Sequence, residues 1–177
     1  ITKTNSNGTF DVTFEDGEPV KKDYRRYRIR EAEAGDDYAC MREVLDRRLR
    51  RVETEPLPDL LMVDGGRGQV GVVVAALADA DLEVEVLGIS KERDDESPSV
   101  RVKRGGGLKA ERLFKPNRTN PIHLPPSSRG MLLLQRIRDE SHRFAIEFQR
   151  ELRSKVNMTS ILEELPGIGP GKRRALL

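Results

Sequence analysis

The stretch Leu57-Pro-Asp-Leu-Leu-Met-Val-Asp-Gly-Gly-Arg-Gly-Gln69 decides which fold is expected for this chain. Its apolar run stops at Asp64 and two glycines follow, which predicts a buried strand, a tight turn and then a helix. In open α/β sheets, ligands and catalytic groups gather at the carboxyl ends of such strands. Asp64 is therefore a candidate ligand for a hard divalent cation, which prefers oxygen donors. Asp-Gly-Gly is also ordinary turn chemistry, and under that interpretation Asp64 binds nothing.

The composition indicates one domain of ordinary size with a small appendage in 177 residues. The formal net charge is only +2, so any preference for an anionic partner depends on how the charges are distributed. The single cysteine, Cys40, excludes an internal disulfide and indicates a reducing, cytoplasmic location. No signal peptide is visible and no apolar run approaches membrane-spanning length, so no membrane partner is expected.

The segments around this stretch predict a mixed sheet with helices packed on it. Residues 9–14 and 24–30 read as an antiparallel hairpin, with Arg26, Arg28 and Arg30 on one face of its second strand. A helix follows in which Asp36 or Asp37 caps the N-terminus. Its expected inner face consists of Tyr38, Met41, Val44, Leu45 and Leu49. After Asp64 we expect a deeply buried helix over about 69–78 and a strand over 83–87 that leads to Lys91.

The second half of the chain is expected to contain a hairpin and a long helix. The polar, glycine-rich segment 92–120 predicts a hairpin with a mobile tip, and residues 124–128 lead into a helix from 129 to about 155. A hinge at 156–158 then separates a last unit. The apolar stripe expected along the helix comprises Leu132, Leu133, Ile137, Phe144, Ala145, Phe148 and Leu152. The chain starts in a polar, turn-like stretch and stops within a helical pattern, so we expect a piece of a longer protein.

The last unit, 159–177, has the pattern of a helix-hairpin-helix motif. Gly167 and Gly169 let the hairpin backbone approach a phosphate closely, and the amides of the following helix then donate to it. Lys172 and Arg173 add positive charge, and such contacts read no base sequence. The alternative is a glycine-rich connector between two helices.

His142 is the second candidate for a chemical role. It lies at the edge of the apolar stripe, with Arg138 one turn before it. A histidine at such a position can orient a water molecule, transfer a proton or bind a metal, although a packed helical histidine is the alternative. Lys91 ends a strand as Asp64 does, so its ammonium group is expected at the same rim of the sheet.

Taken together, these motifs resemble the C-terminal half of the UvrABC system protein C family, the incision subunit of bacterial nucleotide excision repair. They follow the family's order over nearly the whole chain, and the combination is specific although no single piece is. The matching pieces are Asp16-Gly17 with Tyr24-Arg-Arg-Tyr27, Gly35-Asp-Asp-Tyr-Ala39, the stretch 57–69, Leu124-Pro-Pro126, Leu134-Gln-Arg-Ile-Arg-Asp-Glu-Ser-His-Arg-Phe-Ala145 and Leu165-Pro-Gly-Ile-Gly-Pro170.

The resemblance implies an α/β, RNase H-like endonuclease domain over residues 1–155 and a truncated first helix-hairpin-helix motif over 159–177. In this family the domain cuts on the 5′ side of a DNA lesion and needs a divalent metal, which implies Mg²⁺ or Mn²⁺ as cofactor. The implied partners are damaged double-stranded DNA and a UvrB–DNA complex. One departure is that the family's aspartate in a Phe-Asp-Ile-Ser-like motif has no counterpart here, so we expect the N-terminal strand to be missing. Its role is not transferred to Asp11.

The resemblance also assigns roles to individual residues. Asp64 and His142 match catalytic and metal-binding positions, and Asp37 matches a further position tied to 5′ incision, although a capping role explains it equally well. The residues expected to hold the DNA backbone are Arg26, Arg28, Lys91, Arg138, Arg143, Gly167, Gly169, Lys172 and Arg173. One alternative is a catalytically incomplete DNA-binding module or scaffold. Another is a different RNase H-like nuclease, such as a transposase or resolvase core, against which the helix-hairpin-helix pattern argues.

Overall fold

The protein is built around one mixed sheet of six strands. The computed structural model describes residues 2–5, 8–33, 35–91 and 111–164. The sheet order is β5 (Arg25–Tyr27), β2 (Gly8–Asp11), β1 (Thr2–Asn5), β6 (Leu60–Asp64), β7 (Glu85–Lys91) and β8 (Glu111–Phe114). The strands β1, β6 and β7 run parallel to one another, whereas β2, β5 and β8 each pair antiparallel with a neighbour.

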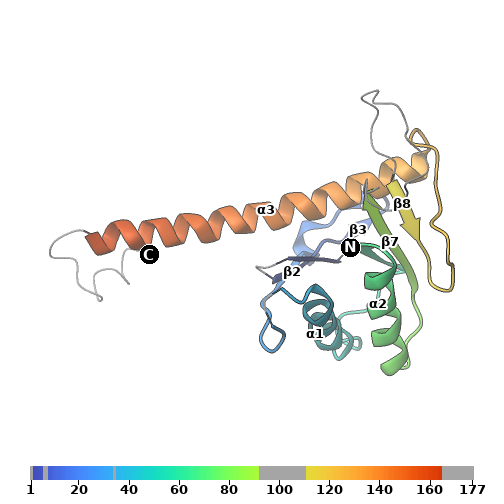
Figure 1. Ribbon diagram of the computed structural model, residues 1–177, viewed down its shortest axis with the longest axis horizontal. Helices are drawn as coiled ribbons and strands as arrows, with labels where there is room; N and C mark the ends of the chain where they lie inside the picture. Colours follow the sequence, from blue (N-terminus) through green and yellow to red (C-terminus); the bar gives the residue numbers. More distant parts are fainter. Residues whose placement is uncertain (1, 6–7, 34, 92–110, 165–177) are drawn as a thin grey trace, which may run out of the picture.

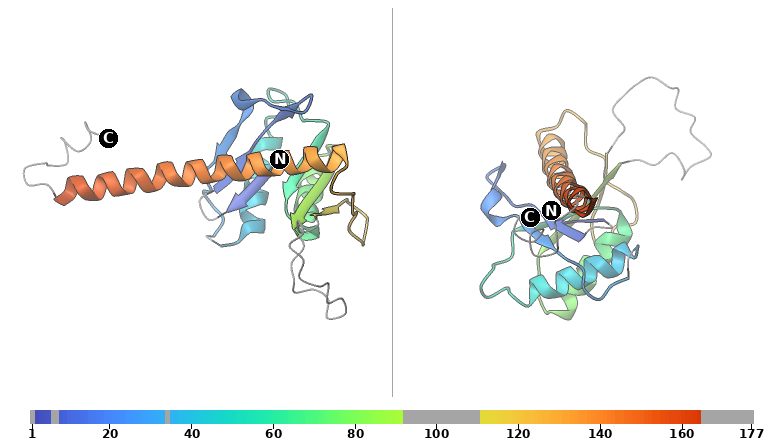
Figure 2. Two further views of the ribbon diagram at one scale, coloured as in Figure 1. Left: turned by 90° about the horizontal axis from the view of Figure 1, so that it is seen from above. Right: turned by 90° about the vertical axis from the view of Figure 1, so that its left-hand side faces the viewer.

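Three helices cover the two faces of this sheet. The helices α1 (Asp37–Leu49) and α2 (Arg67–Asp79) lie on one face, and α3 (Arg129–Glu164) crosses the other (Figure 1; Figure 2, right). This is the mixed α/β architecture that the sequence patterns predict and that the family resemblance implies. Within the described residues, no helix is long and apolar enough to cross a membrane.

The N-terminal stretch differs from its prediction. Residues 2–5 form the strand β1 between β2 and β6, where we expected a polar, turn-like stretch. Thr2 pairs with Asp11 on one side and with Val63 on the other. The hydroxyls of Thr4 and Thr9 also share a hydrogen bond of 3.1 Å. Pairing with two neighbouring strands therefore outweighs the polar composition of this stretch.

The predicted N-terminal hairpin is present but has an elaborate connection. The strands β2 and β5 pair antiparallel, and β5 ends at Tyr27, short of the predicted strand. Between them lie β3 (Phe14–Glu15), β4 (Glu18–Pro19) and a short 3-10 helix (Lys21–Asp23). Both Asp16 and Gly17 have positive φ, as a two-residue hairpin turn requires.

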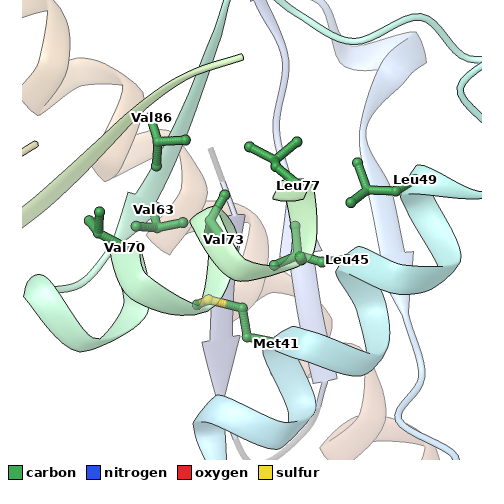
Figure 3. Close-up of a cluster of buried hydrophobic side chains, with 9 residues drawn as sticks. Met41, Leu45, Leu49, Val63, Val70, Val73, Leu77 and Val86 are labelled. Carbon is green, nitrogen blue, oxygen red and sulfur yellow. The ribbon is translucent and has the colours of Figure 1, made fainter. Parts of the chain in front are cut away.

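The main hydrophobic core lies between the sheet and the helices α1 and α2 (Figure 3). It consists of Met41, Leu45, Leu49, Val63, Val70, Val73, Ala76, Leu77 and Val86. Two predictions for this face are wrong: Tyr38 is exposed while Cys40 is buried, and α2 is not buried all round because Val74 is exposed. The cap of α1 is Asp36, whose carboxylate accepts a hydrogen bond of 2.9 Å from the amide of Ala39.

The helix α3 is longer than predicted and its apolar stripe is offset. It runs through residues 156–158, where we predicted a hinge, because that segment contains no glycine or proline to interrupt it. Leu132 and Leu133 are exposed, and Met131 is buried in their place. Phe144 and Ala145 pack on the sheet as predicted. The predicted domain division at 155–159 falls within this helix, and the remaining helix-hairpin-helix residues and most of the polar insert lie outside the described residues.

Candidate active site

The alternation of side chains along β6 determines where Asp64 points. Val63 belongs to the core beneath α1 and α2, whereas Met62 packs on the opposite face with Met131 of α3. Successive strand residues point to opposite faces, so Asp64 shares the face of Met62 and lies beneath α3. The predicted buried strand thus delivers its terminal carboxylate to the face that carries the long helix.

The turn after Asp64 is tight and pressed against the neighbouring strand. The amide of Gly65 donates to the carbonyl of Val63 over 3.0 Å. The side-chain oxygen of Gln69 accepts from the amide of Gly66 over 3.1 Å and so helps to cap α2. A Cβ atom on Gly88 of β7 would lie 2.7 Å from the carbonyl oxygen of Gly65. A side chain at that position would therefore push the turn, and with it Asp64, away from the sheet.

His142 of α3 meets Asp64 directly. The Nε2 atom of His142 lies 3.0 Å from Oδ2 of Asp64. The Asp64 side chain is 16% exposed and that of His142 is 39% exposed. Beside His142, the residues Phe144 and Ala145 pack with Phe10 of β2 and seat this part of the helix on the sheet. Two residues separated by 78 positions in the sequence are thus brought together where solvent can still reach them.

The two donor atoms are compatible with a hard divalent ion. Adjacent ligands of an octahedral Mg²⁺, each at about 2.1 Å, are about 3 Å apart, and the carboxylate and imidazole atoms have that separation. Mg²⁺ is commonly held by one or two carboxylates together with waters and substrate phosphates. Among the described residues, no group of three or more His, Cys, Asp or Glu side chains is placed to hold a metal. The site therefore offers a partial set of protein ligands.

An open depression runs along α3 beside His142. It is lined by His142 together with Asp139, Arg143, Ile146, Glu147, Arg150 and Glu151. Two arginines and three carboxylates give this lining a slight excess of negative charge. Such a lining suits a cation better than an unassisted phosphodiester.

Asp37, the third predicted catalytic residue, lies on the other side of the sheet. It occupies the first turn of α1, and Asp36 provides the cap. The next residue, Tyr38, lies against Gly68 of α2, where an added Cβ would be 2.4 Å from the tyrosine hydroxyl. The residue that caps the helix is therefore Asp36 and not Asp37. The role of Asp37 in incision stays a prediction.

Arg138 is not available to DNA, which contradicts its predicted role. Its side chain is 6% exposed, and its guanidinium pairs with Glu111 of β8 and, over 2.9 Å, with Asp139. It lies on the buried side of the helix, because Ser141, three positions later, is fully buried and Ile137 packs on the adjoining apolar cluster. We therefore remove Arg138 from the DNA-binding set.

The other predicted DNA contacts that the structure describes are at the surface. Arg143 is paired with Glu140 and Glu147 on its own helix, and this pairing raises the pKa of its guanidinium. The guanidinium of Arg26 lies over the rings of Phe144 and Phe148, at 4.8 and 4.9 Å, and pairs with Glu151. Surface ion pairs are weak, so a phosphate can replace the carboxylates.

Arg28 and Lys91 are both exposed. Lys91 ends β7 opposite Glu111, two residues beyond the partner of Asp64, and thus lies at the predicted rim. The predicted phosphate-binding residues Gly167, Gly169, Lys172 and Arg173 lie outside the described residues.

Sequence reasoning did not identify several polar residues around the site. The hydroxyl of Tyr24 donates to Glu140 over 2.8 Å, Glu111 of β8 is buried beneath α3, and Ser141 is buried on the inner side of that helix. A signal for Glu111 is its spacing of two from Leu113, which places both on the same strand face. Nothing in the sequence singles out Ser141 beyond its position next to His142.

Comparison with known proteins finds matches over most of this chain. Residues 2–146 match the family described as UvrC RNAse H endonuclease domain. The chain is 43% identical over 183 residues to UvrABC system protein C of Syntrophotalea carbinolica, covering 98% of this chain and 29% of that protein. It is 44% identical over 168 residues to the protein of Desulforapulum autotrophicum, covering 94% of this chain and 26% of the relative. The Anaeromyxobacter dehalogenans protein is 38% identical over 205 residues, covering 94% of this chain and 29% of the relative.

Proposed function

Because this chain belongs to the UvrC family through its RNase H endonuclease domain, we propose that it hydrolyses a DNA phosphodiester on the 5′ side of a lesion in a reaction that depends on a divalent metal. The observation that carries the proposal is the contact of 3.0 Å between Asp64 and His142, at the end of a central strand and at the edge of an open depression. The chain spans less than a third of the length of these relatives, so the activity of the whole protein is part of the proposal.

The ion, Mg²⁺ or Mn²⁺, would be held by Asp64 and His142 and would polarise the phosphate, favour hydroxide formation and neutralise developing charge. Asp64 contributes the negative charge that attracts the cation into the depression. In the alternative arrangement, Asp64 holds the ion without His142, and the partly exposed ring of His142 orients the attacking water or accepts its proton. Burial of Asp64 beneath α3 fixes the carboxylate and limits the access of bulk water.

DNA is the proposed partner, held in a complex with the UvrB component of the system. Four surface cations are available for this contact: Arg143 lines the depression, Arg26 pairs with Glu151 of its lining, Lys91 ends β7, and Arg28 is exposed just after β5. Contacts of this kind hold phosphates without reading sequence, and binding through them weakens as salt rises.

The test is Asp64→Asn in the full-length protein that carries this chain, assayed on a duplex with a single bulky lesion. We expect 5′ incision to fall by about 10³-fold or more, on the scale of other losses of essential catalytic groups. The matched control is Asp59→Asn, the same change at an exposed residue just before β6, which should leave incision unchanged. Unchanged 5′ incision by Asp64→Asn would show that the proposed function is wrong.

A second candidate is a DNA-binding module that does not cut. It is favoured by the finding that the described residues offer only a partial set of metal ligands. The two candidates are distinguished by incubating the full-length protein with lesion-bearing DNA and Mn²⁺. DNA binding without any 5′ cut, in wild type and Asp64→Asn alike, would favour the module.

A further inference from the structure

The interface between α3 and the sheet contains a buried ion pair close to the Asp64–His142 contact. Arg138 of α3 and Glu111 of β8 have side chains only 6% and 4% exposed, and Nη1 of the arginine donates to Oε1 of the carboxylate. Their surroundings are apolar, because Leu113 and Ile137 belong to the adjoining hydrophobic cluster. Desolvating a charged pair in such a place is costly, so the pair is not explained by a gain in stability.

Three buried polar atoms at this interface lack partners among the described residues. They are Nε of Arg138, Oε2 of Glu111 and Oγ of Ser141. Ser141 is completely buried and lies three positions after Arg138, so both occupy the same side of α3. Buried polar atoms in folded proteins are nearly always hydrogen-bonded, and internal water satisfies those that protein groups do not.

The register of the sheet joins this polar group to the proposed site. Asp64 pairs with Ile89, and Ile89 pairs with Leu113 on β8. Glu111 lies two residues from Leu113 and therefore faces α3 as well. On the helix, Arg138 precedes His142 by four residues, or about one turn. The Arg138–Glu111 contact therefore lies one turn of α3 before the His142–Asp64 contact, and on the same face of the sheet.

We propose that Arg138, Glu111 and Ser141 form a hydrated polar clamp whose task is to position His142 against Asp64. On the same stretch of α3, Met131, Leu134 and Ile137 make apolar contacts, and such contacts fix neither the rotation nor the axial position of a helix strongly. A guanidinium–carboxylate pair is directional and fixes both. The three residues act through His142 and are positioning residues, and this role rests on the proposed function.

The deciding experiment compares single and paired replacement in the full-length protein. The variants Arg138→Met and Glu111→Leu each leave one buried charge, whereas the double variant replaces the pair with apolar groups of similar size. We expect both single variants to lower the melting temperature and the double variant to recover it. The clamp predicts that the double variant still loses about 10- to 100-fold in kcat, the usual cost of disturbing groups that orient an active-site ligand, with an unchanged KM for lesion-bearing DNA.

A second readout does not depend on the metal or on incision. In metal-free protein, the imidazole of His142 is followed by nitrogen NMR, with Asp64→Asn identifying the signal of the Asp64 contact. We expect the double variant to lose this signal although it is stably folded. If the double variant keeps the signal and the kcat of wild type, the pair is merely structural and the clamp is wrong. If instead Asp64→Asn cuts normally, the proposed function fails, while the NMR signal still tests the clamp.

The matched control lies on the other face of the sheet. Arg42 of α1 also bridges two acids, Asp46 over 2.8 Å and Asp79 over 2.6 Å, but at the surface. Arg42→Met should leave the His142 signal and kcat unchanged. For the hydration, a crystal structure should show an ordered water bonded to Ser141 Oγ and to Arg138 Nε or Glu111 Oε2, and a dry interface would contradict that part.

Discussion

The two faces of the sheet are built on different principles. The side beneath α1 and α2 is one continuous apolar cluster of nine residues from two helices and two strands (Figure 3). The side beneath α3 has two smaller apolar clusters, and polar contacts lie beside and between them. These contacts are Asp64–His142, Glu111–Arg138, Tyr24–Glu140 and Arg26–Glu151.

Stability and chemistry are located mainly on different faces of the sheet. A continuous apolar core gains free energy from each buried methylene group and needs no polar partner. Polar contacts, whether buried or at the surface, add little net stability, so their concentration around one helix is better explained by the precise placement of side chains. We therefore expect mutations beneath α3 to change mainly the rate of incision, and mutations beneath α1 and α2 to change mainly the free energy of unfolding.

The largest expected effect is on the α3 side, for activity alone. His142→Ala removes one of the two paired donor groups and should lower 5′ incision by about 10³-fold, within the range for acid–base groups. Its free energy of unfolding should change by less than about 1 kcal/mol, because the ring is partly exposed. Incision kinetics and urea unfolding are measured on the same preparation. If the variant cuts at the wild-type rate, His142 is not required for incision and the α3 side does not carry the proposed chemistry.

The converse prediction concerns the core beneath α1. Leu45→Ala removes a fully packed side chain and should lower the free energy of unfolding by about 3 kcal/mol, from lost transfer energy and the cavity left behind. At a temperature where the variant remains folded, incision per folded molecule should match wild type. Loss of incision without loss of stability would show that this face also shapes the site.

The sequence predicted the elements that local patterns control. The apolar run before Asp64, its two glycines and the helical spacing of Met41, Leu45 and Leu49 were sufficient for β6, the turn and α1. Residues 2–5 were not recognised as a strand, because their order comes from pairing with β2 and β6 and not from composition. Long-range pairing of this kind has no local signal.

The candidate site was predicted only in part for a similar reason. The family resemblance named Asp64 and His142, and the structure places them in contact, but their catalytic and metal-binding roles stay predictions. The burial of Arg138 depends on Glu111, which belongs to a polar segment that was predicted only as a hairpin, without its pairing to β7. An ion pair between residues 27 positions apart becomes visible only when the register of β8 is known.

A smaller effect separates two adjacent acids at the start of α1. Asp36→Ala removes the cap on the amide of Ala39 and should lower the free energy of unfolding by about 1 kcal/mol. Asp37→Ala, one position later, should cost less, because it loses only an interaction with the helix dipole. Thermal unfolding measures both. If Asp37→Ala nevertheless lowers incision while Asp36→Ala does not, the secondary role of Asp37 is functional, and the α1 side contributes to chemistry after all.

The smallest expected effect is a pH dependence on the α1 side, where Glu43 is an acid held by the backbone. Burial opposes its ionisation, but the amides of Arg30, Glu31 and Ala32, with help from Arg47, outweigh that and lower its pKa below the ordinary 4.5. A carboxylate with a depressed pKa stabilises the fold above its ordinary pKa, and this contribution disappears as the pH falls through the depressed value.

Glu43→Gln should therefore lose less than about 1 kcal/mol at neutral pH, since the amide oxygen still accepts hydrogen bonds. Its free energy of unfolding should also fall less steeply than that of wild type between pH 5 and the acid limit, as measured by urea unfolding at a series of pH values. The exposed residue Glu53 supplies a matched Glu→Gln control, for which the slope should not change. Parallel curves for wild type and Glu43→Gln would mean that the acid sensitivity of the protein comes from the carboxylates under α3, and the polar side would then control acid unfolding as well as activity.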